Sequence, residues 1–164
     1  MYFGIFLKQL KKTMETKTDN ATAEVATAYY LRQVAERLSI SLAQALKPFD
    51  TNRSAYRVLI ALARQNPSTM RDLGEATLLV PSTLSRTVEQ LRQSGSVHCE
   101  PDEGDARALK VTMTAKGEQH LAEILPSAAA QYQWAIQGID TKDLEAVHRT
   151  LKKMLSNLKK SPIK

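Results

Sequence analysis

The chain has 164 residues, with 23 Lys and Arg against 17 Asp and Glu, which gives a formal net charge of +6. This length suits one small domain with helical additions, and a basic balance is expected for a partner that carries phosphates. A single cysteine excludes an internal disulfide and no apolar run could span a bilayer, so we expect a cytoplasmic protein without membrane association.

Residues 1–18 are predicted to be a flexible extension. Residues 1–12 are largely apolar and end in lysines, whereas a signal peptide carries its charge before the apolar stretch and a cleavage site after it. An upstream start codon, or an arm that packs on a partner chain, explains this order better than a membrane anchor does.

Residues 19–48 are predicted to form a long helix that ends at Pro48. Its apolar residues recur at spacings of three and four; they are Ala28, Leu31, Ala35, Leu38, Leu42 and Ala45. A second helix is predicted to begin at Asn52 or Ser54. Its expected buried residues are Tyr56, Leu59, Ile60, Leu62 and Ala63, and residues 66–68 are expected to be a loop.

Residues 69–94 predict two helices joined by a tight turn at residues 78–80. Thr69 and Asp72 are spaced almost as a capping box, and Gly74 favours a close crossing by a neighbouring helix. The expected apolar positions of the first helix are Met70, Leu73, Ala76 and Thr77. Pro81 suits the first position of the second helix, and Gly95 suits the position just after its end.

The second of these helices has two different faces. Leu84, Val88 and Leu91 form an apolar stripe. The other faces carry hydroxyl, amide and guanidinium groups, on Ser82, Thr83, Ser85, Arg86, Thr87, Gln90 and Gln93. Such groups bind base edges and phosphates, which predicts a recognition helix. The alternative is a solvated surface helix, although such helices usually carry more Lys and Glu than the single Glu89 found here.

Residues 96–101 and 106–113 predict two strands joined by a polar tip at residues 102–105. A helix-turn-helix followed by such a hairpin is a winged helix. The wing is net acidic, because Asp102, Glu103 and Asp105 lie at its tip. Arg107 is therefore the one candidate for the minor groove, and Asp105, two residues away on the same strand face, is predicted to hold its guanidinium.

Two stretches resemble the MarR (multiple antibiotic resistance regulator) family. Residues 82–86, followed by Leu91 and Gly95, are similar to the recognition helix of that family, and residues 105–107, followed by 111–114 and Gly117, are similar to its wing. The chain differs where wings of this family often carry basic residues, since it has His98, Cys99 and Ala106 there. The resemblance implies a mainly α fold with a small β wing and long terminal dimerisation helices.

Residues 114–160 are predicted to form two further helices. Thr114 is expected to cap the first, Pro126 to kink or break it, and Gly138 to close it; Asp140 is expected to start the second. The apolar seam of the last helix is Leu144, Val147, Leu151, Met154, Leu155 and Leu158. These faces need a cover, which predicts a two-fold dimer built from residues 19–48 and 114–160 around a DNA-binding lobe at residues 49–113. The alternative is an intramolecular bundle.

The predicted function is a dimeric transcriptional regulator that binds a pseudo-palindromic operator in double-stranded DNA. The predicted DNA contacts are Thr69, Ser82, Thr83, Ser85, Arg86, Gln90, Asp105 and Arg107. The resemblance implies a repressor relieved by a small aromatic or phenolic effector, with Tyr30, Tyr56 and Arg57 as the predicted lining of its site. The rival hypothesis is a winged-helix protein-interaction module without specific DNA binding, which the acidic wing favours.

Other chemistry finds little support in the sequence. His98 and Cys99 are strand neighbours that point to opposite faces, and His120 and His148 lack a ligand companion one helical turn away, so we predict no enzyme, no metal site and no cofactor. Cys99 is either a small strand residue or a peroxide sensor, because the sequence does not show whether its thiolate is stabilised.

Overall fold

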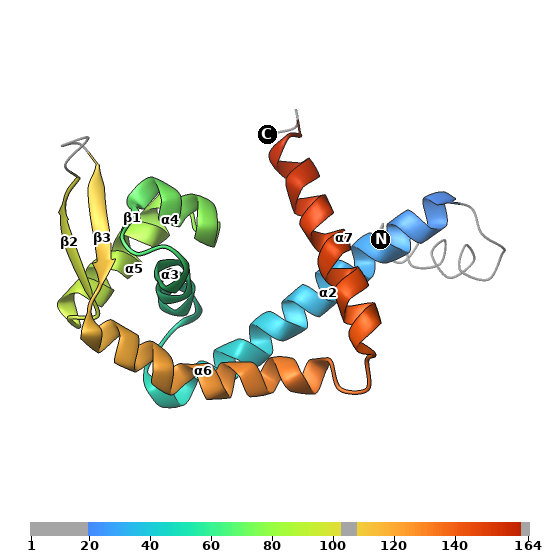
Figure 1. Ribbon diagram of the computed structural model, residues 1–164, viewed down its shortest axis with the longest axis horizontal. Helices are drawn as coiled ribbons and strands as arrows, with labels where there is room; N and C mark the ends of the chain where they lie inside the picture. Colours follow the sequence, from blue (N-terminus) through green and yellow to red (C-terminus); the bar gives the residue numbers. More distant parts are fainter. Residues whose placement is uncertain (1–19, 103–107, 162–164) are drawn as a thin grey trace, which may run out of the picture. The chain divides into compact units, whose positions relative to one another are not determined.

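The structure is a computed structural model that describes residues 20–102 and 108–161 (Figure 1). Its elements are α2 (Asn20–Leu46), the 3-10 helix η1 (Lys47–Phe49), α3 (Arg53–Arg64), β1 (Ser68–Thr69), α4 (Met70–Thr77), α5 (Pro81–Gln93), β2 (Val97–Pro101), β3 (Leu109–Met113), α6 (Ala115–Ala135) and α7 (Thr141–Lys159). The predicted class, mainly α with a small β wing, is confirmed. The chain divides into a larger unit that ends at Gln131 and a smaller unit that begins at Tyr132.

Local capping explains where several helices begin. The side chain of Asn52 accepts a hydrogen bond from the Ala55 amide at the start of α3, and Thr69 and Asp72 form a complete capping box at the start of α4. Asp140 accepts a hydrogen bond from the Lys142 amide at the start of α7. Each such cap stabilises its helix by about 1 kcal/mol. The predicted starts of these three helices are confirmed.

One hydrophobic core joins α3, α4, α5, the sheet and the first part of α6. Its buried side chains are Ala55, Val58, Leu59, Ala61, Leu62, Leu73, Leu84, Val88, Leu91, Val97, Val111, Met113 and Leu121. The predicted stripe of α5 is confirmed. The prediction for α3 was partly wrong, because Ala63 is exposed while Val58 and Ala61 are buried. This helix contacts α4, α5 and β3, so its buried face is wider than one narrow stripe.

The sheet has three antiparallel strands in the order β1-β3-β2. Val97 pairs with Met113 in the hairpin, and Ser68 pairs with Val111 on its other side. The loop predicted at residues 66–68 is wrong at Ser68, which belongs to β1. A strand of two residues is too short to show alternation in sequence, and its partner lies more than 40 residues away.

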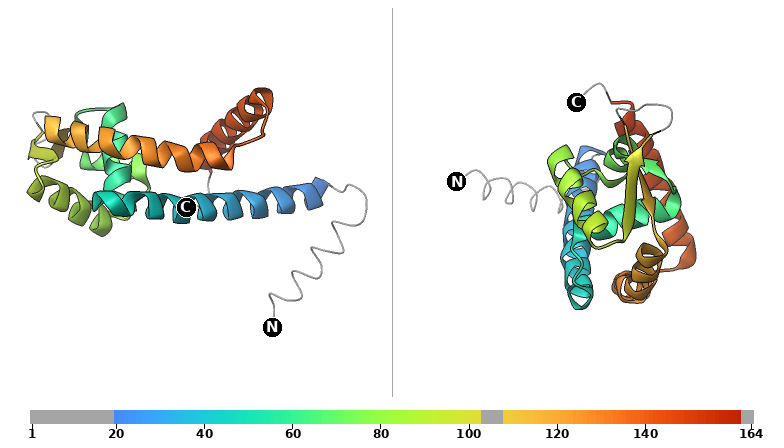
Figure 2. Two further views of the ribbon diagram at one scale, coloured as in Figure 1. Left: turned by 90° about the horizontal axis from the view of Figure 1, so that it is seen from below. Right: turned by 90° about the vertical axis from the view of Figure 1, so that its left-hand side faces the viewer.

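A second, smaller core joins the end of α2 to α6. Leu46, Ile124 and Ala128 are buried there, and Ser41 on α2 donates a hydrogen bond to Gln131 on α6. Figure 2 shows α2 and α6 one above the other in its left view. Of the kink or break predicted at Pro126, the break is excluded, because α6 is continuous from Ala115 to Ala135. Pro126 lies on the exposed side of α6, where water can bond the carbonyl that proline leaves unpaired.

The smaller unit contains the end of α6 and α7. No residue of α7 is buried, and its predicted apolar seam is largely exposed, with 58% of Leu155 and 68% of Leu158 accessible. Tyr132, Leu144, Leu151 and Leu155 line a groove of about 440 Å³ within this unit. Among the described residues of this unit, none covers the apolar face of α7.

Two helical glycines differ in their surroundings. A methyl group added at Gly74 would lie 3.7 Å from the Leu84 side chain, which is an ordinary contact, so the predicted need for a bare backbone at Gly74 was wrong. A methyl group at Gly117 would lie only 2.1 Å from the carbonyl oxygen of Ser96. Gly117 is therefore required at the start of α6, because a residue with a side chain could not lie so close to the backbone of Ser96, which directly precedes β2.

Candidate nucleic-acid interface

The exposed face of α5 carries the side chains that the sequence predicted as DNA contacts. Ser82, Ser85, Arg86 and Gln90 are exposed and Thr83 is half-buried, while the opposite face enters the core. Among the described residues, the guanidinium of Arg86 has no hydrogen bond or ion pair within the chain, so it can reach a ligand without breaking a contact.

Thr87 does not belong to this face. It is buried, and its hydroxyl donates a hydrogen bond of 2.8 Å to the carbonyl of Thr83 one turn earlier. The expectation that Thr87 joins the polar faces was therefore wrong. A threonine with its hydroxyl bonded to its own helix presents a methyl group to the core, which its residue type alone does not reveal.

The turn before α5 exposes two large apolar side chains. Leu78 adopts a left-handed conformation with φ of 55° and is 78% exposed, and Val80, the N-cap residue of α5, is 62% exposed. A positive φ is uncommon for any residue other than glycine. Leu79 between them packs against the core, so the chain turns sharply around this one anchored side chain.

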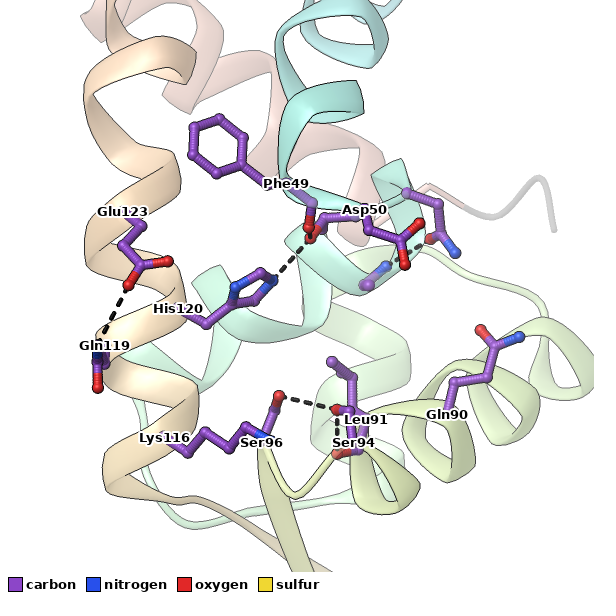
Figure 3. A pocket seen from close by; sticks show the side chains of 13 residues that line it. Phe49, Asp50, Gln90, Leu91, Ser94, Ser96, Lys116, Gln119, His120 and Glu123 are labelled. Carbon is purple, nitrogen blue, oxygen red and sulfur yellow. Dashed lines mark hydrogen bonds between the residues drawn. The ribbon is translucent and has the colours of Figure 1, made fainter.

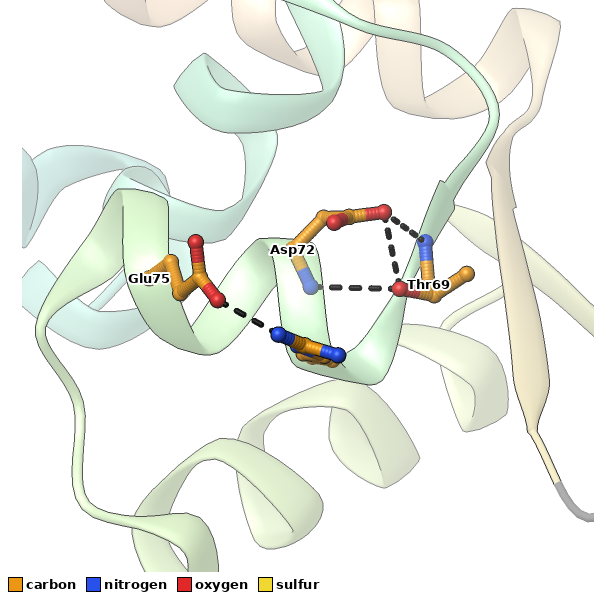
Figure 4. A network of polar contacts seen from close by, with 4 residues as sticks. Thr69, Asp72 and Glu75 are labelled. Carbon is orange, nitrogen blue, oxygen red and sulfur yellow. Dashed lines mark hydrogen bonds and ion pairs between the residues drawn. The ribbon is translucent and has the colours of Figure 1, made fainter.

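Thr69 and Asp72 form the polar network at the start of α4 (Figure 4). The Thr69 hydroxyl donates to Asp72 Oδ2 at 2.8 Å and accepts from the Asp72 amide at 3.1 Å. The one hydroxyl proton of Thr69 is thus used in the hydrogen bond to the Asp72 carboxylate. Thr69 could donate to a phosphate only if this capping box rearranged, so the structure assigns it first to the start of the helix.

The described part of the wing places two neighbouring residues of the predicted first strand differently. His98 is exposed and Cys99 is half-buried, and Lys110 Nζ lies 2.8 Å from Glu100 on the neighbouring strand. Burial raises the pKa of the Cys99 thiol, which disfavours the thiolate that a peroxide sensor needs. Asp105 and Arg107, the predicted contacts at the wing tip, lie outside the described residues.

Sequence reasoning noted Glu89 on α5 but missed the hydrogen bonds that it forms on the exposed face of this helix. Arg92 binds Glu89 through two hydrogen bonds of 2.7 and 2.8 Å, and the Gln93 amide donates a third of 2.8 Å. These hydrogen bonds, the one from Arg92 above all, lower the pKa of Glu89 to about 2. The spacings of three and four residues on one helix were the signal that could have revealed the cluster.

The predicted effector residues come together only in part. Tyr56 and Arg57 line one cavity of about 390 Å³ between α2, α3 and α4, but Tyr30 does not line it. Leu42, Ile60 and Ala76 add apolar surface to this cavity, and Arg64 adds a second guanidinium. Burial raises the pKa of Tyr56, so its hydroxyl remains a hydrogen-bond donor at neutral pH.

A larger cavity of about 610 Å³ lies between the end of α5 and the start of α6. Figure 3 shows Lys116 and His120 on α6, with Gln90 and Leu91 on α5. His120 Nε2 lies 2.7 Å from the Thr51 hydroxyl. The sequence did not indicate this cavity, because its lining comes from several short stretches, none of which has a recognisable motif.

No group of three or more His, Cys, Asp or Glu in the described residues could hold a metal ion. Among the same residues, no helix combines the length and the apolar character needed to cross a membrane.

Comparison with known proteins identifies the family. The sequence model of the MarR family matches residues 49–108, which include α3, α4, α5 and β2. Residues 49–108, the DNA-binding lobe of the chain, match the MarR family. The family resemblance expected from the recognition helix and the wing is confirmed, and it supports a DNA-binding transcriptional regulator rather than an enzyme.

Three relatives carry regulatory names. The chain is 28% identical over 152 residues to the transcriptional repressor NicR of Pseudomonas putida, covering 90% of this chain and 96% of that protein. It is 23% identical over 130 residues to the transcriptional repressor IacR of P. putida, covering 79% and 78%. It is 29% identical over 153 residues to the transcriptional activatory protein BadR of Rhodopseudomonas palustris, covering 87% of each.

Two solved structures share the fold of this chain. A MarR-family regulator from Silicibacter pomeroyi superposes with a TM-score of 0.77 at 24% identity, covering 90% of this chain and all of that one. BpsR of Bordetella bronchiseptica, whose DNA binding is regulated by 6-hydroxynicotinic acid, superposes with a TM-score of 0.70 at 24% identity, covering 79% and 98%.

Proposed function

We propose that this MarR regulator is a homodimeric repressor that binds a pseudo-palindromic DNA operator and releases it when a small aromatic acid binds. The amphipathic α5 carries this proposal, because its inner face is buried in the core while its outer face presents short polar groups and Arg86, whose guanidinium has no partner among the described residues. The names of NicR and IacR support repression, whereas that of BadR leaves activation as the second candidate.

The proposed DNA contacts divide between the two grooves. In the major groove they are Ser82, Thr83, Ser85, Arg86 and Gln90 of α5. Arg107 of the wing would enter the minor groove with its guanidinium held by Asp105. Thr69 would stabilise the start of α4, which would lie beside the sugar-phosphate backbone of the DNA. A net charge of +6 favours this placement on a polyanion.

A mobility-shift titration tests the proposal, using the duplex that lies upstream of the protein's own gene. We expect the binding constant to fall as the salt concentration rises, with a logarithmic slope set by the number of phosphates contacted. The unlabelled upstream duplex should compete for the protein much more strongly than a scrambled duplex does. Equal and weak binding to both duplexes would favour the rival protein-interaction module. Transcription from the upstream promoter with and without the protein separates repression from activation.

The dimer is proposed to form through α2, α6 and α7. The apolar face of α7 is exposed in one chain, and α2 also exposes large apolar residues, including Tyr30, Val34 and Ile40. A second copy covers both faces and places two α5 helices on successive half-sites.

Removal of all residues after Asp140 is expected to give a monomer or an insoluble chain, because it deletes α7. Light scattering measures the mass of the truncated and full-length chains. A truncated chain that remains a well-folded dimer would contradict this assignment of the interface.

The effector is proposed to bind in the cavity of Tyr56 and Arg57. Two guanidiniums, from Arg57 and Arg64, can bind a carboxylate, while Tyr56, Leu42 and Ile60 offer a surface for an aromatic ring. Leu78 and Asp72 also line the cavity, so an occupant would contact the helix-turn-helix directly. The regulation of BpsR by 6-hydroxynicotinic acid supports a ligand of this chemical class.

Replacing both Arg57 and Arg64 with Ala is expected to abolish the release of DNA by an aromatic acid. The measurement is a fluorescence-anisotropy titration of operator-bound protein with 6-hydroxynicotinate, salicylate and benzoate. Lys116→Ala, in the larger cavity, is the matched control and should respond like the wild type. Loss of the response in Lys116→Ala alone would place the effector in the larger cavity instead.

A further inference from the structure

Glu89 occupies the same side of α5 as the proposed DNA contacts. Ser82, Arg86, Glu89 and Gln93 follow one another at spacings of four, three and four, which brings all of them to one face of the helix. All four are exposed, and this face lies opposite Leu84, Val88 and Leu91. A surface that faces DNA therefore includes a carboxylate, which the phosphates repel unless the carboxylate has a partner.

The hydrogen bonds of Glu89 hold this carboxylate in one orientation. Oε1 accepts from Arg92 Nη2 at 2.7 Å and from Gln93 Nε2 at 2.8 Å, while Oε2 accepts from Arg92 Nε at 2.8 Å. A carboxylate offers about four acceptor sites. Three are occupied, so Oε2 keeps one lone pair that can accept a further hydrogen bond. The bidentate Arg92 also offsets the charge that would otherwise repel phosphates.

Cytosine presents a matching partner in the major groove. Its N4 amino group is a donor without a neighbouring acceptor, whereas adenine places its N7 acceptor beside its N6 donor. A fixed acceptor carrying a negative charge therefore favours cytosine over the other bases. The hydrogen bonds from Arg92 and Gln93 keep the side chain ordered before DNA arrives, which reduces the entropy lost on binding.

We propose that Glu89, positioned by Arg92 and Gln93, reads the amino group of one cytosine in each half-site and so sets part of the operator specificity. This role rests on the proposed placement of α5 in the major groove. Glu89 would then confer specificity for the operator, while its negative charge lowers the affinity of the protein for DNA of any sequence. Loss of Glu89 should therefore weaken binding to the operator and strengthen binding to other duplexes.

Selection from a random duplex library, performed with the full-length wild-type chain and with Glu89→Ala, tests the proposal. We expect the wild type to enrich a motif with one conserved cytosine per half-site, and Glu89→Ala to lose the preference at that position while keeping the rest. Affinity for the wild-type operator should fall about 10-fold or more per half-site. Affinity for a scrambled duplex should rise, since a negative charge has been removed.

Glu75→Gln provides the matched control. Glu75 is an exposed glutamate on α4 that pairs with Arg71 at 3.3 Å, so this variant also removes an exposed carboxylate paired with arginine. Its motif should equal that of the wild type, and all three proteins should melt at similar temperatures. If Glu89→Ala binds every duplex more tightly with an unchanged motif, Glu89 is only a repulsive surface charge and the role is refuted. A wild-type chain that enriches no motif would overturn the proposed function itself, and this role with it.

Discussion

Gly117→Ala is expected to lower the free energy of unfolding by about 3 kcal/mol, at the upper end of what overpacking a well-packed site costs. The added methyl group would lie 2.1 Å from the Ser96 carbonyl oxygen and 2.9 Å from Met113 Cγ. The first of these neighbours is backbone and cannot rotate away. That carbonyl also accepts a hydrogen bond from the Thr114 amide at 3.1 Å, which the displacement would weaken. Urea denaturation followed by circular dichroism measures the loss.

Gly74→Ala is the matched control for this prediction. It makes the same chemical change inside a helix, but its methyl group would meet only the Leu84 side chain at an ordinary 3.7 Å. Because alanine favours helix more than glycine does, this variant should be more stable than the wild type by about 0.5–1 kcal/mol. A similar destabilisation by both substitutions would show that close approach at Ser96 is not the reason for Gly117.

Arg86→Ala is expected to weaken operator binding by about 1–3 kcal/mol per half-site if its guanidinium reads a base, and thus by about twice that for a dimer on two half-sites. Arg86 is exposed and its guanidinium has no partner in the part of the chain that the structure describes, so the substitution should leave folding intact. Anisotropy titrations against the operator and a scrambled duplex measure the effect and divide it between specific and general binding.

Arg149→Ala is the control for net charge. Arg149 lies on α7, where its guanidinium is 4.0 Å from Glu145, and its removal lowers the charge of the chain by the same amount. This variant should change operator affinity far less than Arg86→Ala does. Unchanged binding by Arg86→Ala, with a normal melting temperature, would remove Arg86 from the recognition surface.

The elements of the DNA-binding lobe were largely predictable, because their signals are local. The capping pair Thr69 and Asp72, Pro81 at the start of α5 and Gly95 after its end each act within a few residues, and the structure confirms all of them. The apolar stripe of α5 was equally visible, since three large residues at helical spacing bury together.

Features that depend on distant neighbours could not be predicted. The strand at Ser68 exists through pairing with Val111. Thr87 was missed for a different reason, because its residue type does not show whether its hydroxyl bonds its own helix or faces solvent. The sequence does not distinguish Gly74 from Gly117, because both are single glycines in a helical pattern. Only the backbone of Ser96, which lies against Gly117, makes a side chain intolerable at one position and not at the other. For the effector site, the sequence indicated Tyr56 and Arg57 by residue type, but it could not exclude Tyr30, which lies away from their cavity.

The close packing at Gly117 also limits where the proposed dimer could bend. The Thr114 hydroxyl donates to the Gly95 carbonyl at 2.7 Å and accepts from the Gly117 amide at 3.1 Å, and the Thr114 amide donates to the Ser96 carbonyl at 3.1 Å. These three hydrogen bonds join the residues after α5, the start of the wing and the first turn of α6. Leu121, one turn further along, is still buried in the core of the lobe. The first turns of α6 are therefore held against the end of α5. In the proposed dimer, a change in the distance between the two α5 helices would therefore have to arise further along α6, beyond this hydrogen-bonded joint.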